Sequence, residues 1–450
     1  MPPCFVHQKQ FAGPSAKLPA EIARNALESR KNEFDDPEDT GCMDATLFDQ
    51  LETHGGLRVA GRNQYIKYMG SKASILDWVV DGINDVYDGG GVCDLFSGSS
   101  ILSAAIGRQV PVYSNDIQHY SKALAGLYLN AWRTPKTPDA KDLLAEAGKL
   151  VRQRADLIPV SLRYRADSTL TEFNRTEEAN RALIDERFSH RWHYFLRVYS
   201  GTWWSAEQCL WIDAMRQVIE RYREHSCFDL MMVCLMHAMA YASQGTGHYA
   251  QYRNAKTASS LRDIMTYRTR DPRPYFERKY TATLAALPRH APQLKHEITA
   301  IDYRDRLRTL PPCTVYADPP YCFVHYSRFY HALETLYLYD KPELQVKGGS
   351  VVKGRYREDR HQSPFCIGSQ VYGAFEDLFH GVTESGSNLV LSYCNTGMIS
   401  LEELEKLANQ IFGDYDLQIL LSDHRHMTMG RRQDRDREVK ECLILAKRRG

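Results

Sequence analysis

The sequence predicts an α/β fold built around a mostly parallel sheet, and two patterns support this. The first is a series of short runs typical of β-strands, most of which end in turn residues. These runs cover residues 92–96, 110–114, 297–301, 314–317, 388–393, 417–421 and 441–446. The second pattern is the alternation of these runs with helical stretches. Such alternation favours parallel strands and places ligands at their carboxyl ends.

The alternation also indicates how the chain is organised. Residues 1–60 are polar and turn-rich apart from one amphipathic stretch at 18–31, so they predict an N-terminal extension. Between residues 131 and 294 the strand runs stop, and the chain becomes helical and rich in Arg and Trp. We therefore expect a mainly helical insert at 131–294, carried on a discontinuous α/β domain formed by 61–130 and 295–450.

Composition narrows the class of protein. The 57 Lys and Arg residues are balanced by 56 Asp and Glu residues, so any nucleic-acid binding has to come from local basic patches. The 11 cysteines contain no CxxC pair, which argues against a zinc ribbon and suits a reducing compartment. No apolar stretch approaches the roughly 20 residues that a membrane span needs. We expect a soluble, cytoplasmic protein with no bound metal and no membrane partner.

The first strand run ends in a turn of small residues, Asp94-Leu-Phe-Ser-Gly-Ser-Ser100, which opens a helix at Ile101. Small residues let the backbone approach a ligand closely, although such a turn alone is commonly only a link between strand and helix. The next run ends in Asp116, whose carboxylate suits ribose hydroxyls or, alternatively, caps the following helix. A third run ends in Asp302, which is placed to accept from an adenine amino group. Three acids at neighbouring strand ends predict a nucleoside ligand.

The fourth run leads into Asp318-Pro319-Pro320-Tyr321. The two prolines remove two backbone donors and favour an extended loop. The Asp318 carboxylate and the Pro319 carbonyl then form a rigid pair of acceptors for the two N–H groups of an amino group on a base. Such acceptors stabilise a transition state in which that nitrogen becomes tetrahedral. Tyr321 offers a π face to the base. The simpler alternative is a strand-ending turn with a buried tyrosine.

Together, Asp318-Pro-Pro-Tyr321 and Asp94-Leu-Phe-Ser-Gly-Ser99 resemble the signature of the DNA N6-adenine methyltransferases. Tyr68-Met-Gly-Ser-Lys72 precedes the turn and resembles the motif found there in the alpha-ordered, Dam-like enzymes of this family. The resemblance covers about residues 61–130 and 295–450. One departure is Ser100, which stands where many members have a second glycine.

The resemblance implies a Rossmann-like, S-adenosylmethionine-dependent methyltransferase sheet, with residues 131–294 as the target-recognition region. It implies that a target adenine swings out of double-stranded DNA into a pocket formed by the catalytic residues Asp318, Pro319, Pro320 and Tyr321. The cofactor-binding residues that it implies are Tyr68, Lys72, Asp94, Phe96, Gly98, Ser99, Asp116, Ile117 and Asp302.

Two segments combine basic residues with aromatic ones, residues 251–280 and 353–360. Such segments suit phosphate contacts and base stacking, with solvated loops as the alternative. The expected DNA contacts are Arg253, Arg268, Arg270, Arg273, Lys353, Arg355 and Arg357. Residues 424–431 resemble a loop that lies near the flipped base in such enzymes. The six-residue spacing of His325 and His331 favours ordinary packing over metal binding.

Several alternatives share this fold. An N4-cytosine methyltransferase would use the same acceptor pair, although those enzymes more often carry Ser at position 318. RNA adenine methylation needs the same site, and protein glutamine methylation typically pairs with Asn there. A catalytically inactive DNA-binding module is the non-enzymatic alternative. The expected setting is a prokaryotic or phage modification or defence system, with a cognate restriction or defence protein as a candidate partner.

Overall fold

The computed structural model describes residues 56–450 except 63, 246, 322–324 and 423–440, all within the unit formed by residues 50–450. The predicted amphipathic stretch at 18–31 and the segment at 424–431 lie outside the described residues.

The described part of the chain contains a seven-stranded sheet with the order β3-β2-β1-β4-β7-β9-β8. The first five strands in this order run parallel, and β9 pairs antiparallel with both β7 and β8. This confirms the predicted α/β fold with a mostly parallel sheet, and each predicted strand run overlaps one of these strands. The strands are β1 (Val92–Asp94), β2 (Val112–Asn115), β3 (Glu297–Thr299), β4 (Thr314–Ala317), β7 (Asn388–Cys394), β8 (Tyr415–Leu421) and β9 (Glu441–Arg448).

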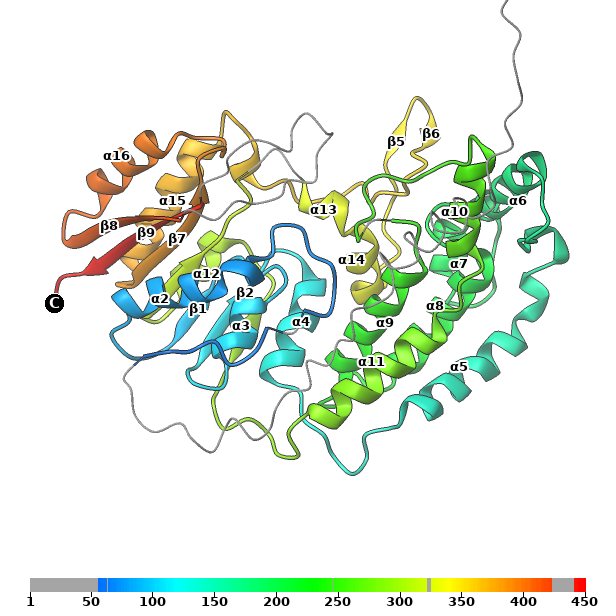
Figure 1. The fold of residues 1–450 in the computed structure, drawn as a ribbon, viewed down its shortest axis with the longest axis horizontal. Coiled ribbons are helices and arrows are strands. Elements are labelled where there is room, and N and C mark those ends of the chain that lie inside the picture. The colour runs from blue at the N-terminus through cyan, green and yellow to red at the C-terminus, as the bar shows by residue number, and fades with distance from the viewer. Residues whose placement is uncertain (1–55, 63, 246, 322–324, 423–440) are drawn as a thin grey trace, which may run out of the picture. The chain divides into compact units, whose positions relative to one another are not determined.

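Helices cover both faces of the sheet (Figure 1). Alternate residues of a strand point to opposite faces, and β4 shows this because Val315 belongs to one apolar core and Tyr316 to the other. The core on the Tyr316 face is closed by α2 (Leu76–Val86), α3 (Ile101–Ile106) and part of α4 (His119–Leu129). The core on the Val315 face is closed by α12 (Tyr303–Thr309), α15 (Val371–Glu384) and α16 (Leu401–Ile411).

A third apolar core belongs to the helices of the central part of the chain, with Trp203 and Trp204 fully buried in it. The segment after the Asp318 loop joins this core, because Leu333 packs there and the Trp203 indole N–H donates to the Gly354 carbonyl at 3.1 Å. The expected domain boundaries, with an insert at 131–294 between 61–130 and 295–450, stay a prediction. The central helices are α5 (Ala140–Gln153), α6 (Leu170–Ala182), α7 (Tyr194–Tyr199), α8 (Ala206–Glu220), α9 (Phe228–Ala242), α10 (Ala258–Arg268) and α11 (Arg273–Ala286).

Shorter elements complete the described chain. The segment after the Asp318 loop forms α13 (Tyr326–Phe329), α14 (His331–Leu338) and a hairpin of β5 (Val346–Lys347) with β6 (Ser350–Val351). Two 3-10 helices, η2 (Lys72–Ile75) and η6 (Pro364–Cys366), lie near the carboxyl ends of the parallel strands. Three others are η3 (Ala155–Leu157), η4 (Val160–Leu162) and η5 (Leu183–Asp185).

Candidate active site

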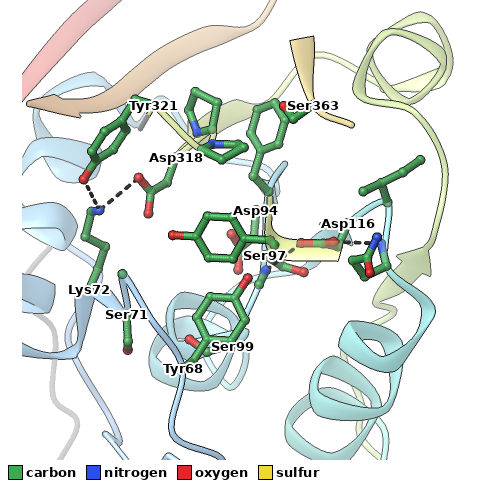
Figure 2. Close-up of a pocket in the computed structure, with 18 of the residues that line it drawn as sticks. Tyr68, Ser71, Lys72, Asp94, Ser97, Ser99, Asp116, Asp318, Tyr321 and Ser363 are labelled. Carbon is green, nitrogen blue, oxygen red and sulfur yellow. Dashed lines mark hydrogen bonds and ion pairs between the residues drawn. The ribbon is translucent and has the colours of Figure 1, made fainter. Parts of the chain in front are cut away.

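A cavity of about 600 Å³ lies at the carboxyl ends of the parallel strands. Every residue that the sequence analysis assigned to cofactor binding or catalysis lines it, and the close-up in Figure 2 shows several of these side chains facing one space. The fold thus brings together three separate segments, residues 68–72, 94–117 and 302–321. The lining includes Tyr68, Lys72, Asp94, Phe96, Gly98, Ser99, Asp116, Ile117, Asp302, Asp318, Pro319, Pro320 and Tyr321.

The turn after β1 is shaped by two left-handed backbone positions, Gly98 (φ 47°) and Ser100 (φ 56°). A Cβ atom added at Gly98 would lie 2.8 Å from the Tyr68 hydroxyl oxygen, so this position favours glycine on both conformational and steric grounds. Asp94 joins the start of the turn to α3, because its carboxylate accepts from the Ser103 hydroxyl at 2.8 Å. Burial raises the pKa of Asp94 to about 7.

Asp116 joins this turn to the second strand. One of its carboxylate oxygens accepts from the Gly98 backbone N–H at 2.9 Å, and the other accepts from the Gln118 backbone N–H at 2.8 Å. Gln118, not Asp116, is the N-cap residue of α4. Burial raises the pKa of Asp116 to about 6. The carboxylate therefore stabilises the shape of the turn in addition to facing the cavity.

Asp302 is tied to its own helix. Its carboxylate accepts from the Arg304 backbone N–H at 2.9 Å and forms an ion pair with the Arg304 side chain at 2.9 Å. Burial alone would raise the pKa of Asp302, but these contacts hold it below its usual value. In this structure Asp302 thus caps α12 while it lines the cavity.

The Asp318 carboxylate faces a buried ammonium group. Lys72 Nζ lies 3.0 Å from Asp318 Oδ1, and it also donates to the Tyr321 hydroxyl at 3.1 Å (Figure 2). The Tyr321 hydroxyl in turn donates to Glu441 Oε1 at 3.1 Å. Burial raises the pKa of Asp318 to about 6, and the charge of Lys72 opposes that rise. Sequence reasoning missed Glu441, since it begins a strand and belongs to no recognisable motif.

The backbone of the Asp318 loop is fixed on both sides. The Cys366 thiol donates to the Pro320 carbonyl at 3.3 Å, and the Met398 backbone N–H donates to the Tyr321 carbonyl at 3.0 Å. Both donors lie more than 40 positions away along the chain, so no local pattern could have identified them. These contacts hold the two prolines and Tyr321 at the edge of the sheet.

Tyr68 is held in an aromatic stack. Its ring packs against Tyr330 at 4.9 Å with an interplanar angle of 8°, and against Tyr326 at 5.7 Å with an angle of 23°. The Tyr330 hydroxyl also accepts from the Met69 backbone N–H at 2.8 Å. The segment that carries Tyr68 and Lys72 is therefore anchored by Tyr326, the first residue of α13, and by Tyr330, which lies between α13 and α14.

The cavity fits a nucleoside-bearing cofactor with a short polar tail. It combines a turn of small residues at a helix start, a carboxylate at the end of the second strand and two aromatic rings, Phe96 and Tyr68. These are the residue types that such a ligand requires, at the strand ends where α/β sheets bind ligands.

Comparison with known proteins agrees with this geometry. The family model for the D12 class N6 adenine-specific DNA methyltransferases matches residues 68–358, from the Tyr68 segment through the Asp318 loop and β6. The chain belongs to this family.

Characterised methylases of bacteria resemble this family member over most of its length. The modification methylase LlaI of Lactococcus lactis subsp. lactis is 22% identical over 394 residues, which cover 85% of this chain and 55% of the relative. The type II methyltransferase M.NlaIII of Neisseria lactamica is 22% identical over 385 residues, 83% of this chain and 96% of the relative. The type II methyltransferase M.FokI of Planomicrobium okeanokoites is 25% identical over 76% of this chain and 46% of the relative. The chain thus spans about half the length of LlaI and M.FokI, and nearly all of M.NlaIII.

The residues expected to contact DNA fall into two groups. Arg268 and Arg355 are buried, which corrects the expectation that they face phosphates. Arg268 forms a buried ion pair with Glu177 at 2.7 Å and donates to the carbonyls of residues 202 and 203. Arg355 donates to the Arg181 carbonyl at 3.2 Å. Basic residues next to aromatic ones also pack in protein cores, and the sequence pattern does not separate the two cases.

The other candidates keep more contact with solvent. Arg253, Arg273 and Lys353 have side chains that are 41%, 63% and 50% exposed, and each forms an ion pair with a nearby acid. Arg270 is half-buried, lies over the Tyr267 ring at 4.8 Å and donates to the Tyr241 carbonyl. Arg357 pairs with Asp340 through both terminal nitrogens and is only 11% exposed.

Two further features bear on the predicted partners. His331 is fully buried, with Nε2 3.2 Å from the Tyr249 carbonyl, and His325 lies 3.1 Å from the Gln362 side chain. In the part of the chain that the structure describes, no group of three or more His, Cys, Asp or Glu side chains is placed to hold a metal ion. Within the same residues, none of the helices has both the length and the apolar character of a membrane span.

Proposed function

We propose that this protein transfers a methyl group from S-adenosylmethionine to the N6 amino group of an adenine that has swung out of double-stranded DNA. The observation that carries the proposal is the position of the Asp318 carboxylate, at the edge of the same cavity as the Gly98 turn. An acceptor for a base amino group and a turn suited to a nucleoside thereby share one space. The proposed setting is a prokaryotic or phage modification or defence system, in line with the modification and type II names of the relatives.

When bound, S-adenosylmethionine supplies an electrophilic methyl group. Asp116 and the backbone of the Gly98 turn would hold its ribose and amino-acid end, and Phe96 and Tyr68 would contact its apolar parts. Lys72 stays a proposed cofactor contact, and its ammonium also pairs with the Asp318 carboxylate. We therefore propose a second role for Lys72, in the catalytic half of the site.

Asp318 and Pro319 act on the target amino group. The lone pair of adenine N6 is delocalised into the ring, which makes the nitrogen a poor nucleophile. Hydrogen bonds from its two N–H groups to the Asp318 carboxylate and the Pro319 carbonyl favour the tetrahedral nitrogen of the transition state. The carboxylate is also a suitable acceptor for the proton that this nitrogen must lose, because burial has raised its pKa to about 6.

Tyr321 supplies the surface for the base. Its ring is held edge-on to Tyr393 with the ring centres 5.4 Å apart, and its hydroxyl is fixed between Lys72 and Glu441. A rigid aromatic face lowers the cost of taking a base out of the duplex, because the base exchanges one stacking partner for another.

Expression of the chain in a host that lacks adenine methylation tests the proposal. DNA from these cells is sequenced with modified-base detection, and N6-methyladenine is expected in one sequence motif. DNA from cells that express the Asp318→Ala variant serves as the matched control and should lack the mark. Methylated cytosine would indicate the N4-cytosine activity instead. The absence of any modified base would favour a DNA-binding module.

A further inference from the structure

A second carboxylate, Glu441, faces the catalytic loop from the neighbouring strands. It is the first residue of β9, pairs with Cys394 of β7 in the antiparallel ladder and lines the same cavity as Asp318. Its exposed fraction is only 4%. Burial of a carboxylate to this extent costs free energy unless a nearby cation or hydrogen-bond donor compensates its charge.

The contact of Glu441 with Tyr321 has a defined direction. A phenol has one proton to donate, and the Tyr321 hydroxyl donates it to Glu441 while it accepts from Lys72, each at 3.1 Å. Lys72 Nζ also lies 5.1 Å from the centre of the Tyr321 ring. The hydroxyl is thus held from two sides, by an acceptor and a donor that approach from different segments of the chain.

Lys72, Asp318, Tyr321 and Glu441 form one charged cluster. The positive charge of Lys72 in it interacts with the carboxylates of both Asp318 and Glu441. Lys72 is in direct contact with Asp318. Glu441 acts on both partners, since its charge raises the pKa of Lys72 and that of Asp318. Removal of the Glu441 charge therefore lowers the pKa of both Lys72 and Asp318 while both residues stay unchanged.

We infer that Glu441 is a positioning residue for methyl transfer, which holds the Tyr321 ring in the orientation that the target adenine stacks upon and shares Lys72 with Asp318. The inference rests on the proposed function, because it assigns a role within that reaction. A purely structural role, in which Glu441 only closes the ladder between β7 and β9, is the alternative that the experiment must separate.

The test uses single-turnover methyl transfer to a duplex that carries the motif found by sequencing, at a pH well above 7. Glu441→Ala should slow transfer about tenfold, as expected for the loss of one positioning hydrogen bond, while Glu441→Gln keeps an acceptor and should stay within about threefold of the wild type. In the Tyr321→Phe background, Glu441→Ala should have no further effect beyond about twofold, because both changes remove the same contact. Glu403→Gln, in the capping box of α16, is the matched control with the same exchange.

The pH profile adds a readout that a structural role would not move. Because the Glu441 charge raises the pKa of Asp318, Glu441→Gln should shift the acid limb of the rate profile to lower pH. Apart from Glu441, the titratable groups around Asp318 and Lys72 are Asp94, Tyr316, Tyr321 and Cys394. None of these four groups is changed in the Glu441→Gln variant.

Three outcomes would overturn the inference: a wild-type rate in a folded Glu441→Ala variant, a Gln variant as slow as the Ala variant, or additive effects in the double variant. Should Glu441→Ala fail to fold, Glu441→Gln still decides through its pH profile, and an unshifted acid limb counts against the inference. If the wild-type protein transfers no methyl group at all, the proposed function fails first, and the two failures are thereby distinguished.

Discussion

At the scale of single residues, the environment of Asp318 sets the ionisation state of its carboxylate. Burial raises its pKa and the Lys72 ammonium lowers it, and the outcome of about 6 leaves the carboxylate ionised at neutral pH. An ionised carboxylate accepts hydrogen bonds from an amino group, whereas a protonated one would compete as a donor. The ion pair of Lys72 with Asp318 therefore keeps the buried carboxylate in the form that accepts hydrogen bonds.

Asp318→Ala should remove most of the catalytic rate, since loss of one fixed group at such a site typically costs about 10²–10³ in rate. DNA binding should change little, because the residue lies inside the cavity. Single-turnover transfer of a radiolabelled methyl group to adenine-containing duplex measures the rate, and a filter assay measures binding. Equal rates in variant and wild type would refute the mechanism.

Lys72 should set the acid limb of the pH profile. The wild-type rate should fall as the pH drops below about 6, because Asp318 then becomes protonated. Lys72→Met removes the charge that lowers the pKa of Asp318, so the limb should move to higher pH. Lys72→Arg keeps the charge and is the control. A limb that stays in place in the Met variant would mean that the pair does not control this titration.

At the scale of elements, the turn after β1 and the start of α4 act as one unit, because the Asp116 carboxylate bridges the Gly98 and Gln118 backbone N–H groups. Asp116→Ala leaves both donors without this acceptor and removes the proposed partner of the ribose hydroxyls. Affinity for S-adenosylmethionine should weaken by roughly 1–3 kcal/mol. Calorimetry measures it, with Asp302→Ala as a comparison at the next strand end. Unchanged affinity would exclude this role for Asp116.

The contact between α6 and α10 depends on a buried ion pair. Arg268→Ala leaves the Glu177 carboxylate buried without its cation, which should cost about 3–5 kcal/mol in the free energy of unfolding. Arg273→Ala, at an exposed position near the start of α11, should change it by less than about 0.5 kcal/mol. Urea denaturation compares the two. Similar stabilities would show that Arg268 is not held as the structure has it.

At the scale of the whole molecule, the almost neutral net charge of +1 means that the proposed DNA binding has to come from local cations. We propose Arg253, Arg273 and Lys353 as contacts, since their side chains are at least 41% exposed. Their joint substitution by Ala should weaken DNA binding and lower the salt slope by up to about one unit per lost phosphate contact.

Fluorescence anisotropy at several salt concentrations measures this slope. A variant with Arg308, Lys447 and Arg449 changed to Ala loses the same charge from other exposed positions and is the matched control. Affinity for the methyl donor should stay the same in both. Equal slopes in the two variants would mean that the proposed cations do not contact DNA individually.

The sequence by itself determined the order of the strands along the chain, the glycine turn and the Asp318 loop. These features depend on residues close together in the chain: the Gly98 turn needs a left-handed backbone, and the two prolines after Asp318 restrict their own neighbours. For this reason the strand runs could be predicted, and so could the residues of the Gly98 turn and of the Asp318 loop that line the cavity.

The tertiary structure alone decided which distant side chains meet. It paired Lys72 with Asp318, placed Glu441 against Tyr321 and buried Arg268 against Glu177. A sequence pattern shows that a residue is charged but not whether its partner is water, DNA or a buried acid. That choice depends on contacts between segments up to several hundred positions apart, whose geometry is fixed only when the sheet and the helices pack together.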